Sequence, residues 1–195
     1  MNSHAATLRL AVFPRAGLFV DALLVVAGAA VVAAAAQISV KLPFTPLPIT
    51  GQTFSVLLVG ASLGSLLGST SMLLYLVLGI AGAPVYAHHT SGWSVITGAT
   101  GGYVVGFVIA AAVTGFLAER QWDRRLSSAI AIMLTGNVVI YLVGLPWLAS
   151  VLDTNLEKTL ELGLYPFVPG DIFKLYLAAA LLPGAWWLVE RSGRR

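Results

Sequence analysis

The sequence contains no cysteine, and it contains few charged residues. Without cysteine there is no disulfide framework, no thiolate nucleophile and no cysteine-ligated metal site. Charged residues make up 10% of the 195 residues and hydrophobic residues 58%, whereas a typical soluble domain is about 25% charged. The chain therefore has too few charges to cover a globular surface in water, and we expect an integral membrane protein.

Motifs for nucleotide hydrolysis and for metal-dependent catalysis are also missing. A P-loop needs the dipeptide Gly-Lys, which does not occur, and no His-Glu-x-x-His segment is present. Ser62 lies between two glycines as in a nucleophile turn, but His88, the nearest base, is expected on the opposite face of the membrane. The sequence therefore predicts a protein that is not an enzyme, with no catalytic residue, no metal site and no cofactor or nucleotide site.

A long stretch without charge has room for several membrane spans. Between Lys41 and Glu119 there is no Asp, Glu, Lys or Arg, and a spanning helix needs about 20 apolar residues. The apolar region 52–83 is too long for one crossing, and the turn-forming residues 68–71 near its middle divide it into two short helices. We therefore expect a single all-α, polytopic membrane domain over residues 1–195, with a cytoplasmic tail at 1–16 and six transmembrane helices near 18–40, 52–66, 69–82, 101–118, 126–150 and 171–190.

The basic residues predict the orientation of these spans. Eight of the eleven lysines and arginines fall into three clusters, and the cytoplasmic ends of spans collect such residues. With six spans all three clusters lie on one side, so both termini are expected in the cytoplasm; five spans would separate the clusters. This topology also explains the net charge of +3, so no nucleic-acid partner is predicted. The clusters are Arg9 and Arg15; Arg120, Arg124 and Arg125; and Arg191, Arg194 and Arg195.

The three connections expected on the outer side are long and distinctive. Residues 41–51 contain three prolines, which fix φ and make a stiff loop. Residues 83–100 contain His88 and His89, and residues 152–170 carry several charges and have room for a short surface helix. Ordered outer loops over a bundle of helices indicate a lidded pocket that faces outward.

The most informative polar residues lie at the outer end of the last span. Asp171 and Lys174 are three residues apart, so on a helix they share a face and can pair. Either both lie in the lipid headgroup region, or together they offer an acceptor and a donor to a polar ligand. Gln37, Gln52 and Asn137 are uncharged polar residues in or beside helices, and each either ties helices together or contacts a ligand.

Small residues recur at helical spacing, which lets helices approach closely in lipid. For the glycines, packing within the bundle is the simpler interpretation. For the alanines, docking to a partner membrane protein is an equal alternative. The positions are Gly60, Gly64 and Gly68; Gly98, Gly102 and Gly106; and Ala29 and Ala33 in the first span.

Five segments, taken in order, carry a specific resemblance that extends from about residue 20 to residue 185. They are Pro43-Phe-Thr-Pro-Leu-Pro-Ile-Thr-Gly-Gln-Thr53, Leu78-Gly-Ile-Ala-Gly-Ala-Pro-Val-Tyr86, Gly98-x-Thr-Gly-Gly-Tyr-x-x-Gly-Phe107, Gly136-Asn-x-Val-Ile-Tyr-x-x-Gly-Leu-Pro-Trp147 and Pro169-Gly-Asp-x-x-Lys174. These segments resemble the BioY family, the biotin-binding substrate (S) components of energy-coupling-factor (ECF) transporters.

The resemblance implies high-affinity biotin binding and uptake across the cytoplasmic membrane by the substrate-specific subunit of an ECF-type transporter. The implied partners are a transmembrane coupling subunit and two ATPase subunits, besides the lipid bilayer. The alternative is a solitary or homo-oligomeric carrier that works without an ATPase module. The implied docking surface contains Ala29 and Ala33, and the implied biotin-binding residues are Asp171, Lys174, Phe44, Gln52, Tyr86, His88, Gly101, Tyr103 and Asn137.

His88 and His89 depart from the family pattern, in which Arg, Gly or Asn is common at these positions. Histidine changes its charge near neutral pH. If this loop helps to hold the biotin carboxylate, the departure predicts some pH dependence of binding.

Overall fold

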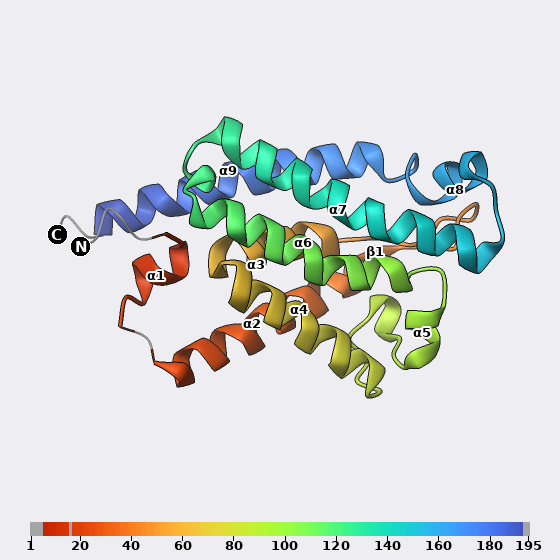
Figure 1. The fold of residues 1–195 in the computed structure, drawn as a ribbon, viewed down its shortest axis with the longest axis horizontal. Helices are drawn as coiled ribbons and strands as arrows, with labels where there is room; N and C mark the ends of the chain where they lie inside the picture. Colours follow the sequence, from red (N-terminus) through yellow and green to blue (C-terminus); the bar gives the residue numbers. More distant parts are fainter. Residues whose placement is uncertain (1–5, 16, 193–195) are drawn as a thin grey trace.

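The computed structural model describes residues 6–15 and 17–192, which form a bundle of six helices joined by shorter elements (Figure 1). The bundle helices are α2 (Leu18–Gln37), α3 (Gln52–Leu63), α4 (Ser65–Ile80), α6 (Gly101–Glu119), α7 (Leu126–Leu152) and α9 (Val168–Ser192). The shorter elements are α1 (Leu8–Val12), β1 (Ser39–Val40), β2 (Ile49–Thr50), η1 (Ala87–His89), α5 (Trp93–Thr97), η2 (Trp122–Arg124) and α8 (Leu156–Gly163). The prediction of a mostly helical chain is confirmed, and α8 is the helix expected within 152–170. The antiparallel pair of β1 and β2 was not predicted.

Successive bundle helices run in opposite directions between two ends of the molecule (Figure 1). At one end lie α1, η2 and the last turns of α9; at the other lie α5, α8 and the loop between β1 and β2. Residues 1–5 and 16 of the predicted tail, and Arg194 and Arg195, lie outside the described residues. Within the tail, Arg9 of α1 donates to Asp21 Oδ1 of α2 from Nε at 2.9 Å and from Nη2 at 2.5 Å. This ion pair fixes α1 to the start of the bundle.

Helix length divides the six bundle helices into two groups. Four of them, α2, α6, α7 and α9, are long and apolar enough to cross a membrane. The apolar helices α3 and α4 have only 12 and 16 residues. At 1.5 Å per residue they are roughly 18 and 24 Å long, shorter than the ~30 Å of a hydrocarbon core. The predicted division of the region 52–83 into two short helices is confirmed.

The break between α3 and α4 lies at Gly64, so the predicted turn at residues 68–71 is wrong. Gly64 has φ +91°, a left-handed value that glycine adopts without strain. Glu119 at the end of α6 accepts hydrogen bonds from Ser65 N at 2.7 Å and Ser65 Oγ at 2.8 Å, and so caps α4. The hydroxyl groups of residues 69–71 instead donate to carbonyl groups one turn earlier within α4.

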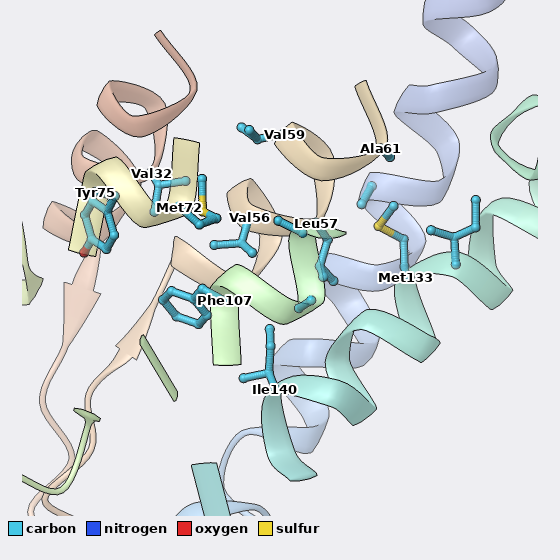
Figure 2. Close-up of a cluster of buried hydrophobic side chains, with 14 of the residues drawn as sticks. Val32, Val56, Leu57, Val59, Ala61, Met72, Tyr75, Phe107, Met133 and Ile140 are labelled. Atoms are coloured by element: carbon cyan, nitrogen blue, oxygen red, sulfur yellow. The ribbon is translucent and has the colours of Figure 1, made fainter. Parts of the chain in front are cut away.

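The interior of the bundle is filled by apolar side chains that meet around α6 (Figure 2). None of the following is more than 4% exposed: Val32 of α2, Leu57 of α3, Met72 of α4, Phe107 of α6 and Ile140 of α7. Because lipid tails are as apolar as these side chains, the bundle is held together by close packing rather than by burial from water.

Glycines provide that close packing at two helix crossings. A Cβ on Gly68 would lie 2.8 Å from the Cα of Gly60, so α4 crosses α3 with almost no side chain between them. A Cβ on Gly106 would lie 3.3 Å from the Cα of Ile140, where α6 crosses α7. The interpretation of the glycine stripes as helix packing is confirmed at these positions.

One carboxyl group is fully buried at the end of the bundle that carries α1. Asp123 of η2 is 0% exposed, and its Oδ2 accepts a 2.5 Å hydrogen bond from Trp186 Nε1 of α9. Its Oδ1 has no hydrogen-bond partner among the described residues, and the Arg124 guanidinium lies 4.2 Å from the centre of the Trp186 ring. Loss of hydration on burial raises the pKa of the Asp123 carboxyl, although the Trp186 hydrogen bond and the Arg124 charge act in the opposite direction.

We expect Asp123→Asn to remove a pH-dependent loss of stability. Because the pKa is raised by folding, this group stabilises the protein fully below the ordinary carboxyl pKa of about 4, and the stabilisation is lost as pH rises through the folded-state value. As pH rises above 4, the thermal midpoint of the wild type in detergent should therefore fall more steeply than that of the variant. Glu157→Gln, at an exposed site on α8, is the control and should follow the wild type. Parallel curves for wild type and Asp123→Asn would contradict this assignment.

Candidate ligand-binding site

A cavity of about 400 Å³ lies at the end of the bundle that carries α5, α8 and the loop between β1 and β2. Sites for small molecules typically have volumes of ~300–1,000 Å³. The inner wall comes from α3, α6, α7 and α9, and the rim comes from residues 41–50 and 86–100. We therefore take this cavity as the candidate ligand site.

The only charged pair on the cavity wall, among the described residues, is Asp171 with Lys174 on α9. Lys174 Nζ lies 3.3 Å from Asp171 Oδ1 and donates to Thr53 Oγ1 of α3, also at 3.3 Å. The hydroxyl of Tyr141 on α7 donates to Asp171 Oδ2. The predicted pairing is thus present, and it joins three helices. Asp171 lies inside the first turn of α9, which begins at Val168.

This pair keeps hydrogen-bonding capacity for a ligand. The Asp171 side chain is 10% exposed and the Lys174 side chain 19% exposed, so both charges are largely removed from solvent. An ionised carboxylate has about four acceptor positions and an ammonium three donors. Two positions on each group are occupied by the contacts just described. About two acceptor positions and one donor therefore remain at the cavity wall, beside the positive end of the α9 dipole.

Gln52 and Tyr86 form another part of the wall, and their polar groups are already engaged. Gln52 Nε2 donates to the Tyr75 hydroxyl at 2.7 Å, and Gln52 Oε1 accepts from Thr50 Oγ1 at 2.9 Å. The Tyr86 hydroxyl donates to the Leu76 carbonyl at 2.7 Å. Burial raises the pKa of Tyr86 to about 12, so its phenol stays neutral at physiological pH. These two residues therefore offer shape and an aromatic surface more than free hydrogen bonds.

His88 reaches the cavity from η1 with one free nitrogen. Its Nδ1 lies 2.7 Å from Ser39 Oγ of β1. Its Nε2 is buried and has no hydrogen-bond partner among the described residues. Buried polar atoms are nearly always paired, so this nitrogen is a candidate contact for a ligand atom.

Tyr103 links the cavity wall to α8. Its hydroxyl donates to the Gly163 carbonyl at 3.0 Å, and its ring lies edge-on to Tyr141 with the ring centres 6.2 Å apart. The surface helix α8 is thereby held next to the charged pair, because Tyr141 also bonds Asp171.

Six of the nine predicted ligand residues line the cavity: Asp171, Lys174, Gln52, Tyr86, His88 and Tyr103. The other three do not. Phe44 is 61% exposed on the outside of the loop between β1 and β2. The space beside Gly101 is occupied by the Ile96 carbonyl group. Asn137 is 8% exposed and lies one helical turn beyond Tyr141, within the bundle, with its Oδ1 unpaired among the described residues.

Sequence reasoning missed Tyr141, Thr53 and Ser39. Tyr141 lies in the segment that carries Asn137, four residues along the same helix face. Its signal was the single tyrosine of this span, but the choice between the two residues depends on the position of α9.

The small residues of α2 divide into an inner and an outer set. Ala29 is 3% exposed and faces the core together with Gly28, Val32 and Ala36, while Ala33 is half-buried. The exposed alanines of α2 are Ala22, Ala27, Ala30 and Ala34. Ala29 is therefore not part of an exposed docking surface. The small residues that do face outward include Ala30 and Ala34, each one position further along the helix than Ala29 and Ala33.

The chain is similar to known membrane transporters along most of its length. The BioY family model matches residues 6–191. The probable biotin transporter BioY of Pyrococcus horikoshii is 42% identical over 146 residues, which cover 75% of this chain and 83% of that protein. The biotin transporter BioY of Rhizobium etli is 34% identical over 149 residues, which cover 73% of this chain and 79% of that protein.

A solved structure has the same fold as this chain. It is the crystal structure of the S-component for biotin from an ECF-type ABC transporter, with a TM-score of 0.76 and 23% identity over 85% of this chain and 89% of that chain. The family consists of transporters, so the prediction that the chain is not an enzyme is confirmed. By its match over residues 6–191, the chain belongs to the BioY family.

Proposed function

We propose that this chain binds biotin at the outer face of the cytoplasmic membrane and delivers it for uptake as the substrate-specific S component of an ECF-type transporter. The observation that carries the proposal is the Asp171–Lys174 pair, buried in the wall of a ligand-sized cavity in a chain of the BioY family. Such a subunit works with a transmembrane coupling subunit and two ATPase subunits, which we take as its partners.

The proposal includes a topology of six spans with both termini in the cytoplasm. The bundle helices alternate in direction, and the arginines of the described residues lie at the end that carries α1 and η2 (Figure 1). Arginine-rich ends of spans face the cytoplasm. The short helices α3 and α4 then count as two crossings. The paired strands β1 and β2, which follow α2 and precede α3, extend these two helices toward the outer surface while their backbone groups stay paired within the protein. The cavity opens outward in this orientation.

The charged pair suits the ureido ring of biotin. That ring offers two N–H donors and a carbonyl acceptor, and the other end of the molecule is a carboxylate. Asp171 accepts from N–H groups but repels a second carboxylate, so the ureido ring is the end that meets Asp171. Lys174 is close enough to Asp171, at 3.3 Å, to donate to the ureido oxygen from the same side.

The carboxylate end then lies nearer the rim, where His88 Nε2 is unpaired. An imidazole whose Nδ1 accepts from Ser39 presents Nε2 as an N–H donor. Between the two ends, the apolar side chains Val95, Val104 and Phe107 line the cavity and match the thiophane ring and the aliphatic chain.

Equilibrium binding of labelled biotin to the purified protein tests the proposal. We expect saturable binding of a single biotin per chain. Desthiobiotin, which keeps the ureido ring and the carboxylate, should compete, whereas the diamine obtained by removing the ureido carbonyl should not. Folded, monodisperse protein that binds no biotin would overturn the proposal.

A further inference from the structure

The segment that carries His88 has an uncommon backbone. His88 has φ 57° and ψ 35°, and His89 also has φ 57°. Two consecutive residues with a Cβ in the left-handed region are unfavourable for a free chain. Such a conformation persists only where the surrounding structure holds it, and it occurs often at ligand sites.

Two side chains hold this turn, one at the end of α2 and one in β1, which follows α2. Gln37, the last residue of α2, donates from Nε2 to the Tyr86 carbonyl at 3.2 Å, and its Oε1 accepts from His89 N at 3.0 Å. Ser39 Oγ lies 2.7 Å from His88 Nδ1. The three contacts hold the turn at Tyr86, His88 and His89. We refer to Gln37 and Ser39 as the α2 clasp.

The clasp explains how His88 Nε2 comes to be buried and unpaired at the cavity wall. With the backbone fixed on both sides and Nδ1 engaged by Ser39, the imidazole lines the cavity and keeps one nitrogen, Nε2, buried and without a partner among the described residues. A second contact of Gln37, from Nε2 to the Ala33 carbonyl at 3.0 Å, locks its own side chain against α2. The side-chain amide of Gln37 is therefore held in place and does not move with the segment 86–100 when that segment opens.

We propose that Gln37 is a positioning residue: through the α2 clasp it holds His88 against the bound ligand and so determines how long the ligand stays in the cavity. This inference rests on the proposed function. Residues 86–100 form part of the rim, so a ligand leaves when this segment opens, and the clasp stabilises the closed form. Because Gln37 ends the helix that carries the outward alanines Ala30 and Ala34, a displacement of α2 moves the same rim.

The test is the rate of biotin dissociation from Gln37→Met, measured by chasing labelled biotin with unlabelled biotin. Methionine keeps the length of the side chain but removes the donor and the acceptor. We expect dissociation to be about tenfold faster and association to change by less than a factor of two. Gln121→Met makes the same substitution at the opposite end of the molecule, on an exposed side chain, and should leave both rates unchanged.

Measuring Gln37→Met in a protein that already lacks the His88 imidazole separates positioning of His88 from a general stabilisation of the closed form. In His88→Asn, which keeps a residue that tolerates the left-handed region but lacks the imidazole, adding Gln37→Met should accelerate dissociation by less than a factor of two. Equal acceleration in both backgrounds, or none in the wild-type background, would overturn the inference.

Amide hydrogen exchange of the ligand-free protein distinguishes failure of the clasp from failure of the proposed function. The amides of residues 86–90 should exchange faster in Gln37→Met than in wild type and Gln121→Met. If they do, but no protein binds biotin, the clasp stands and the proposed ligand is wrong. If they do not, the clasp itself is refuted, whatever the ligand.

Discussion

Asp171→Asn is expected to weaken biotin binding by about a hundredfold or more. Asparagine has the same size, so the cavity keeps its shape, but one of the two carboxylate acceptors becomes an N–H donor. That donor either faces the N–H groups of the ureido ring or displaces the Tyr141 hydroxyl from its acceptor. Lys174 also loses its ion-pair partner in a place where its side chain is only 19% exposed, and an unpaired buried charge is costly.

Equilibrium titration with labelled biotin measures this effect. Two further variants serve as a comparison and as a control. Tyr141→Phe removes one hydrogen bond to Asp171 but no charge, so we expect a loss of about tenfold. Asp153→Asn removes an exposed carboxylate beyond the end of α7 and should bind as the wild type does. An affinity of folded Asp171→Asn within threefold of the wild type would show that the charged pair is not the ureido site.

Local rules were enough to predict the charged pair. Two residues three apart near the start of an apolar helix lie on one face, whatever the rest of the fold does. The pair is found at 3.3 Å in the cavity wall. In the same way, the lengths and polarities of the apolar regions predicted the bounds of the six bundle helices to within a few residues. They did not predict that β1 and β2 form a strand pair.

Features that depend on the rotation of a helix were not predictable from one sequence. Asn137 and Tyr141 share a face of α7, and only the position of α9 decides that Tyr141 is the residue that meets Asp171. The alanines of α2 pose the same problem, because a helix rich in Ala and Val has no polar face to mark its outside. The resemblance therefore pointed to Ala29, which is 3% exposed, whereas the neighbouring Ala30 faces outward.

The position of the break between α3 and α4 was predicted wrongly for a different reason. Residues 68–71 have the composition of a turn, yet their hydroxyl groups are satisfied within the helix. Gly64 ends α3 because Glu119, at the end of α6, supplies the cap for α4. Since the cap comes from a helix distant in sequence, no window around Gly64 contains it.

Ala30→Trp and Ala34→Trp are expected to abolish uptake driven by a coupling module while leaving biotin binding within a factor of two. Both alanines lie on the outer face of α2, and small residues on such a face let another helix approach closely in lipid. An indole at either position separates the two helices by several ångströms. Neither side chain lines the cavity, so the equilibrium affinity for biotin should be retained.

Uptake of labelled biotin by cells that contain or lack a coupling module measures this prediction. Leu142→Trp, on an exposed site of α7 that is 69% accessible, is the matched control and should transport as the wild type does. Normal module-dependent uptake by Ala30→Trp would contradict docking through the outer face of α2. If the wild type transports equally well without the module, and Ala30→Trp does too, the chain works as a solitary or oligomeric carrier, because only a protein that needs no partner is indifferent to this substitution.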